Sequence, residues 1–113
     1  MADKLECLYD LSLRPTYEML RTSPEAADIV EAAETPSGRE AMQQIRTRKI
    51  AMISGLLAPY APALDRHGQT PADLGAFAET ALHGMLMSAE DIDALHRQFA
   101  SFKAAILSLT ANT

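Results

Sequence analysis

The feature that most constrains the fold is a row of large apolar residues near the end of the chain. They follow one another by alternating steps of three and four over eighteen positions: Ile92, Leu95, Phe99, Phe102, Ile106 and Leu109. This spacing places all six side chains on one stripe of an α-helix, whereas a strand would alternate every second residue. It is typical of helices that pack at about +20° in bundles. We therefore expect a helix over about 91–110 that packs against other helices.

Apolar residues recur with the same helical spacing over 3–22, 39–58 and 71–87. Pro15 interrupts the first segment, which is either one kinked helix or two helices with Pro15 in the first turn of the second. Ser23 and Pro24 begin a short helix that reaches about Ala33. Pro59, Pro62 and the segment 65–68 break the helix ahead of 71–87.

Hydroxyl side chains before the helical segments predict where helices start. Ser37, with Glu40 three residues later, forms a capping-box pattern, and Ser88 with Asp91 gives a similar signal before the last helix. Thr70 precedes Pro71 as a cap. No strand pattern competes, so we expect an all-α, five- to six-helix bundle without β-sheet, forming a single domain over 1–113.

Composition and charge exclude several classes of protein. Ten Lys and Arg against fifteen Asp and Glu give a net charge of −5. A domain that binds nucleic acid alone usually carries a basic face. The one local basic cluster joins Arg39 and Arg46, seven residues apart, to Arg48 and Lys49, which are expected to point elsewhere on the helix. We expect no nucleic-acid binding by this chain alone.

The N-terminal residues and the cysteine content bear on the compartment. No apolar run approaches the 18 residues that a membrane span needs, and the first four residues lack the pattern of a signal peptide. Cys7 is the single cysteine, which excludes an internal disulfide and favours a reducing compartment. We expect a cytoplasmic protein that does not contact a membrane.

The residues that could carry chemistry form no catalytic or metal-binding pattern. Metal sites need three or four converging ligands, and no His-Glu-x-x-His or Glu-x-x-His spacing occurs. Nucleophile and phosphate-binding motifs are also missing, so we expect no enzyme, no metal and no cofactor. His83 lies in an apolar segment. It is either a partly buried histidine bonded to Glu79 or a backbone carbonyl, or a polar group that faces a ligand cavity.

Two parts of the chain resemble a known family. The segment 78–87 (AETALHGMLM), followed by an acidic helix start and the seam that ends in 102–107 (FKAAIL), resembles the last two helices of TetR-family transcriptional regulators. The upstream segments 14–20 (RPTYEML) and 23–27 (SPEAA) are similar to the family's helices before its pocket. The family's N-terminal helix-turn-helix domain, with its Tyr-Phe-x-x-Lys stretch, has no counterpart here.

The resemblance implies the C-terminal effector-binding and dimerisation domain of such a regulator, most often a repressor. DNA would be bound by an N-terminal helix-turn-helix domain missing from this chain. The helices at about 71–87 and 91–110 would pair with those of a second copy as a four-helix homodimer, and the earlier helices would enclose a small apolar or aromatic effector. Binding would alter DNA affinity through a shifted helix pair.

Candidate site residues follow from the same reasoning. Side chains that combine apolar bulk with occasional polar tips are expected to line the ligand cavity: Tyr9, Tyr17, Met52, Phe77 and His83. The helices 71–87 and 91–110 each show two apolar strips, more than one small core can cover. Their large residues are therefore expected at the dimer interface: Leu82, Met85, Leu86, Leu95, Phe99, Phe102 and Ile106. The alternative is a helical protein-interaction adaptor without a small-molecule pocket. A closed apolar cavity above roughly 300 Å³ would favour the regulator.

Overall fold

The computed structural model describes residues 1–23 and 25–111, and every regular element within these ranges is helical. The elements are α1 (Ala2–Leu8), a π-helical turn (Tyr9–Leu13), α2 (Arg14–Thr22), α3 (Ala26–Ala33), α4 (Pro36–Leu57), a 3₁₀ turn (Ala58–Tyr60), α5 (Ala61–Asp65), α6 (Pro71–Ser88) and α7 (Ile92–Thr110). The prediction of an all-α fold is confirmed. None of the helices in the described ranges has both the length and the apolar character that a membrane crossing requires.

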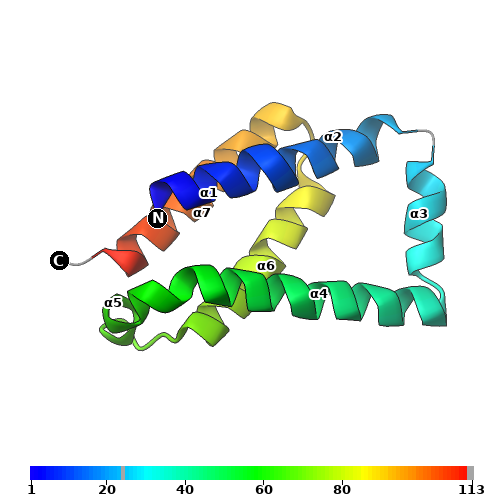
Figure 1. Cartoon of the computed structure of the whole chain (residues 1–113). Coiled ribbons are helices and arrows are strands. Elements are labelled where there is room, and N and C mark those ends of the chain that lie inside the picture. Colours follow the sequence, from blue (N-terminus) through cyan, green and yellow to red (C-terminus); the bar gives the residue numbers. More distant parts are fainter. Residues whose placement is uncertain (24, 112–113) are drawn as a thin grey trace.

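The N-terminal third of the chain is one rod made of α1, the π-helical turn and α2 (Figure 1). Pro15 lies in the first turn of α2, directly after the π-helical turn. A proline has no N–H to donate and its ring clashes with the carbonyl four residues earlier, and the wider π turn relieves both problems. Four side chains spaced by four residues then face the core: Leu5, Tyr9, Leu13 and Tyr17.

Side-chain caps fix the starts of α4 and α6. Thr70 Oγ1 accepts a hydrogen bond from the Asp73 backbone N–H at 3.1 Å, as predicted. The capping box at Ser37 was wrong, because α4 begins at Pro36 and Thr35 is its cap. Thr35 Oγ1 accepts from the Gly38 N–H at 3.0 Å. Proline is favoured at a first helical position, which shifts the cap to the residue before it.

The start of α7 also differs from the Ser88 prediction. Ser88 is the last residue of α6, and its hydroxyl donates to the Gly84 carbonyl at 2.6 Å. Asp91 caps α7 instead, with its Oδ1 accepting from the Ala94 N–H at 2.7 Å. The acidic side chain places its charge at the positive end of the helix dipole, which a serine does not.

The helices α2, α3, α4 and α6 surround an open region of the molecule (Figure 1). α3 connects the end of the N-terminal rod to α4, and α6 crosses α4 and rises toward α2. The crossing is tight at Gly75, where a Cβ atom would lie 2.3 Å from Ser54 Oγ and 3.1 Å from the Ser54 backbone nitrogen. A larger residue at this position would require Ser54 to rotate and the two helices to shift apart.

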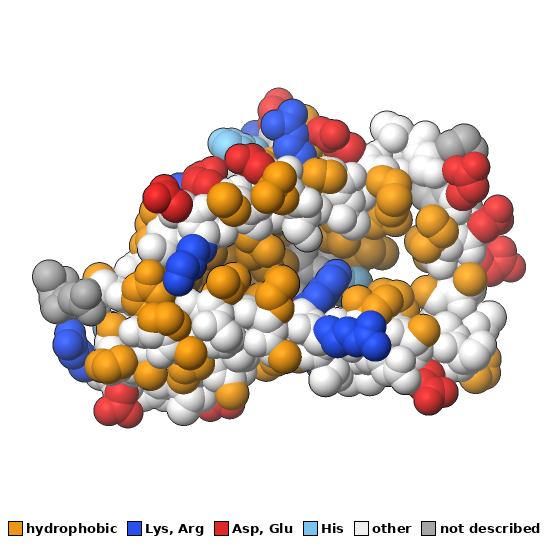
Figure 2. Space-filling view, in the orientation of Figure 1, with side chains coloured by type: hydrophobic (Ala, Val, Ile, Leu, Met, Phe, Trp, Pro, Cys, Tyr) orange, Lys and Arg blue, Asp and Glu red, His pale blue; other side chains and the backbone are white. Residues whose placement is uncertain are grey.

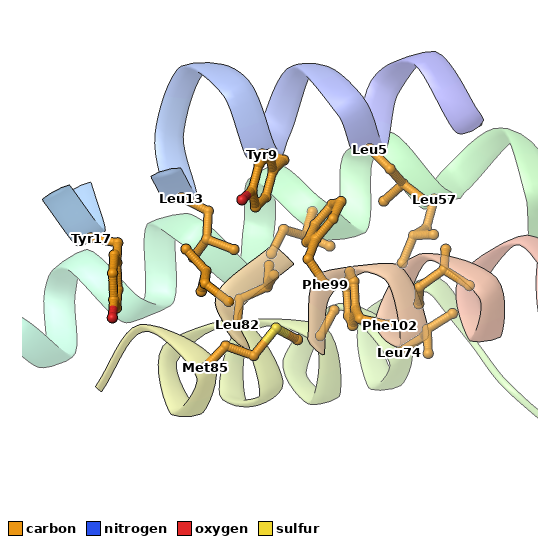
Figure 3. Close-up of a cluster of buried hydrophobic side chains, with 14 of the residues drawn as sticks. Leu5, Tyr9, Leu13, Tyr17, Leu57, Leu74, Leu82, Met85, Phe99 and Phe102 are labelled. Atoms are coloured by element: carbon orange, nitrogen blue, oxygen red, sulfur yellow. The ribbon is translucent and has the colours of Figure 1, made fainter. Parts of the chain in front are cut away.

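The hydrophobic core lies between the N-terminal rod, α4, α6 and α7. Figure 3 shows Tyr9 and Leu13 of the rod pointing toward the residues of α6 and α7. The rings of Tyr9 and Phe99 are 4.8 Å apart between centroids, and those of Phe99 and Phe102 are 5.8 Å apart. These separations lie within the range in which aromatic pairs attract each other.

The row of apolar residues on α7 faces this core. Six of the seven residues predicted for a dimer interface are buried within the chain itself, and Leu86 is partly buried. The N-terminal rod covers this part of the core, so the apolar strips of the two helices do not require a second copy to bury them. The homodimer stays a prediction, and its contacts would have to use the outward side of α7, where Ala100 and Ala104 are exposed and Leu107 is partly buried.

Candidate functional site

Three adjoining cavities lie along the region that α2, α3, α4 and α6 surround, and we call them together the hollow. The inner cavity holds about 60 Å³ between the rod, α4 and α6 and is lined by Leu8, Ser12, Leu13, Thr16, Lys49, Met52, Ile53, Glu79, Leu82, His83 and Leu86. The α4 groove holds about 330 Å³ and is lined by Arg39, Met42, Gln43, Ile45, Arg46, Lys49, Glu79 and His83. The α3 cavity holds about 100 Å³ and is lined by Leu20, Arg21, Val30, Leu86 and Met87.

Neighbouring cavities of the hollow share lining residues. Lys49, Glu79 and His83 line both the inner cavity and the α4 groove, and Leu86 lines both the inner and the α3 cavity. The inner cavity is smaller than the closed cavity of about 300 Å³ that would have favoured the regulator, and the α4 groove, which exceeds that volume, is open to solvent. A ligand would therefore lie mainly in the groove and reach into the inner cavity.

Exposed apolar side chains gather around the hollow. The described residues include nine large hydrophobic side chains that are well exposed, and five of these line the hollow: Val30, Met42, Ile45, Met52 and Met87. Figure 2 shows hydrophobic and basic side chains next to each other around this opening. Apolar side chains grouped in a concave region are typical of a binding site, whereas scattered ones are ordinary surface.

A buried carboxylate lies at the junction of the inner cavity and the α4 groove. The Glu79 side chain is 8% exposed, and its Oε2 lies 2.9 Å from Arg46 Nε. This pair is not aligned as a hydrogen bond, so Oε2 keeps acceptor capacity. Arg46 also donates from Nη2 to Thr80 Oγ1 at 3.0 Å. The ion pair thus joins α4 to α6 and neutralises the one acidic side chain that lines the hollow.

Three of the four basic residues of α4 share one face, contrary to the sequence interpretation. Arg39, Arg46 and Lys49 all line the α4 groove, and Met42 completes a series of steps of three, four and three. Lys49 lies three residues after Arg46, which places the two side chains on the same side of a helix. Arg48 lines none of the three cavities. The prediction that Lys49 points away from the other two was wrong.

The five side chains predicted for ligand binding do not come together. Met52 and His83 line the inner cavity, and His83 also lines the α4 groove. Phe77 is 64% exposed and lines no part of the hollow.

The two predicted tyrosines belong to the core. Tyr9 packs on α7, and burial raises the pKa of its hydroxyl above the ordinary 10.0. The Tyr17 hydroxyl donates to the Ala89 carbonyl at 2.7 Å. Both side chains combine bulk with a polar tip, but neither of them lines the hollow.

Sequence reasoning missed Lys49, Glu79 and Arg46. A signal was present, because Lys49 precedes Met52 and Ile53 by three and four residues and so shares their helix face. Glu79 and His83 were recognised as a pair four residues apart, but the charge facing them from α4 was not. Within the part of the chain that the structure describes, no three His, Cys, Asp or Glu side chains are grouped as a metal site requires.

Comparisons with known proteins give a partial relationship. No family model matches the chain, and no solved structure matches it. The chain is 39% identical over 82 residues to hydroxylamine reductases from two strains of Porphyromonas gingivalis. The similarity covers 66% of this chain but 15% of each reductase, so the chain spans a small part of the length of these relatives.

Proposed function

We propose that this chain is the effector-binding and dimerisation domain of a TetR-like transcriptional regulator, and that the hollow takes a small apolar or aromatic molecule. The observation that carries the proposal is the gathering of five of the nine exposed large hydrophobic side chains around the three adjoining cavities of the hollow. Covering such side chains with a ligand is favourable by about 25 cal/mol for each Å² of apolar surface removed from water.

The dimensions and the composition of the hollow are compatible with a small ligand. The α4 groove, at about 330 Å³, falls within the roughly 300–1,000 Å³ typical of ligand pockets. Three of the exposed residues around the hollow are methionines: Met42, Met52 and Met87. Their flexible thioethers repack around ligands of different shape, which suits a sensor of apolar molecules.

The position of α6 supports a regulatory role. Leu82 and Leu86 of α6 line the inner cavity, and Leu82 and Met85 belong to the hydrophobic core that α6 shares with α7. A ligand between α4 and α6 would therefore change the position of the α6–α7 pair. In the proposed homodimer, this pair faces the second copy. This movement would be transmitted to a DNA-binding domain outside this chain.

The proposal is tested by thermal unfolding of the chain with a panel of small apolar and aromatic compounds. We expect at least one compound to raise the melting temperature, because a ligand that binds only the folded state stabilises it by mass action. Met52→Ser and Ile45→Ser should weaken the effect. Phe77→Ser removes a large exposed side chain outside the hollow and serves as the control. If no compound stabilises the chain, or the hollow variants respond like the control, the adaptor function is favoured instead.

The proposed homodimer is tested separately by analytical ultracentrifugation at low micromolar concentration. We expect a dimer, and we expect Ala104→Glu on the outward side of α7 to give a monomer with unchanged helicity. Gln98→Glu adds a charge at another exposed position of α7 and should leave the dimer intact. A wild-type chain of 12.3 kDa in solution would contradict the dimer.

A further inference from the structure

We infer that the ligand of the hollow is an amphipathic carboxylic acid whose carboxylate binds Lys49 and whose apolar part covers Met52 and Ile45. This inference rests on the proposed function and narrows it to one chemical class.

The hollow is strongly basic although the chain is acidic. Four cationic side chains line it, namely Arg21, Arg39, Arg46 and Lys49, against Glu79 alone. The whole chain carries a net charge of −5. A local excess of three positive charges from Lys and Arg is therefore a specific property of this concave face. Such a face attracts small anions and disfavours cationic ligands.

Two of the four cations are already occupied by contacts within the chain. Arg46 lies 2.9 Å from Glu79 Oε2, and Arg21 donates to the Ala89 carbonyl at 2.8 Å. Lys49 and Arg39 form no ion pair with any residue that the structure describes. The charge available to a ligand is therefore positive, because Glu79 is neutralised by Arg46 whereas Lys49 and Arg39 are not neutralised.

Lys49 is placed where the polar and apolar parts of the hollow meet. It lines both the α4 groove and the inner cavity, and Met52 follows one turn later on the same helix face. A molecule that bridges the two cavities would bring its polar end to Lys49 and lay its apolar body along Met52 and Ile45. A neutral apolar molecule would fill the same space but leave Lys49 without a partner.

The inference is tested by measuring the affinity of the chain for decanoic acid and for 1-decanol by isothermal titration calorimetry at pH 7. The two probes share a ten-carbon chain and differ in charge. A charge-assisted hydrogen bond near the surface predicts that the acid binds about tenfold more tightly than the alcohol. The preference should fall as salt is raised from 20 to 500 mM. Over that range the screening length for exposed charges shortens from about 20 Å to about 4 Å.

Lys49→Gln should remove the preference for the acid and leave the affinity for 1-decanol unchanged. Arg48→Gln makes a matched loss of charge on the neighbouring residue, which lines none of the three cavities, and should keep the preference. Both side chains are exposed, so both variants are expected to fold, which circular dichroism checks.

Each other outcome overturns a defined part of the reasoning. Equal binding of both probes overturns the carboxylic acid and leaves an apolar ligand in place. A preference for the acid that survives in Lys49→Gln overturns the placement of the carboxylate at Lys49. Binding of neither probe overturns the carboxylic acid, and the proposed function fails as well only if the wider panel of apolar compounds also gives no stabilisation.

Discussion

The joint between the N-terminal rod and the turn after α6 allows a sharp test of the fold. Two side chains of α2 donate to one carbonyl, that of Ala89, which is 1% exposed. The Tyr17 hydroxyl lies 2.7 Å from the carbonyl oxygen and Arg21 Nη2 lies 2.8 Å from it. The Arg21 guanidinium also stacks on the Tyr17 ring, with 4.8 Å between its central carbon and the ring centroid. Either donor alone would therefore still leave the Ala89 carbonyl with a hydrogen bond.

The single variants Tyr17→Phe and Arg21→Met should each lower the free energy of unfolding by about 1 kcal/mol, the usual net value of one hydrogen bond. Either variant leaves the Ala89 carbonyl with one donor. The double variant leaves this buried carbonyl with none, and an unsatisfied buried group costs about 1–3 kcal/mol more. We therefore expect the double variant to lose about 3 kcal/mol, at least about 1 kcal/mol beyond the sum of the single losses.

Urea unfolding followed by circular dichroism at 222 nm measures these losses. With a slope of about 2 kcal/mol per M, each single variant should lower the urea midpoint by about 0.5 M and the double variant by about 1.5 M. Tyr60→Phe is the control, because no hydrogen bond of its hydroxyl is found among the described residues, and it should change the midpoint little. Losses that add to within about 0.3–0.5 kcal/mol would refute the shared-acceptor reasoning.

Three further predictions follow from the packing and the charges. Gly75→Ala should destabilise the chain by about 1–2 kcal/mol in urea unfolding, because its Cβ would meet Ser54, whereas Gly84→Ala should stabilise it by up to about 1 kcal/mol, because a Cβ there meets nothing within 4 Å. If Gly75→Ala stabilised the chain and Gly84→Ala destabilised it, α4 and α6 would not approach each other closely at Gly75. The Ser23 hydroxyl, which donates to Glu25, and the Glu25 backbone N–H lower the pKa of Glu25 below 4.5, so its contribution to stability is present above that pH and is lost as the pH falls through the lowered pKa. Carboxyl NMR titration should give a midpoint below 4.5 that rises in Ser23→Ala, and an unchanged midpoint would contradict this cause. Phe99→Glu and Phe102→Glu should unfold the chain, because both side chains face the core, and a soluble folded monomer of either variant would place them on an outer surface instead.

The fold class and most helix boundaries were predictable because they depend on local patterns. The helix at 91–110 was predicted from spacing alone and is present as Ile92–Thr110. Breaks at Pro59 and at 65–68 were also predicted, and Gly68 takes the left-handed conformation, with φ of 68°, that ends α5. Local signals failed where two candidates competed for one cap, as Ser37 did with Thr35 and Ser88 with Asp91.

The candidate site was much less predictable, because periodicity shows which face of a helix is apolar but not what that face meets. Tyr9 and Met52 carry similar signals in the sequence, yet Tyr9 packs on α7 and Met52 lines the inner cavity. The difference arises from the path of the N-terminal rod, which lies over α7 and is set by contacts between residues more than 80 positions apart, such as Tyr9 and Phe99. No pattern within a single helix contains that information.

The tight crossing at Gly75 connects the packing of α6 to the proposed response to a ligand. The close approach of Gly75 and Ser54 prevents α4 and α6 from moving nearer to each other there, and the Arg46–Glu79 pair also joins the two helices one turn farther along α6. Glu79 and His83 lie one and two turns farther along α6 and line the α4 groove, where the two helices leave space between them. A ligand in the groove would therefore turn α6 about the Gly75 crossing rather than push it away as a whole. The far end of α6, which is followed by Ala89 and leads into α7, would move most. The Tyr17 and Arg21 hydrogen bonds to Ala89 would resist that movement.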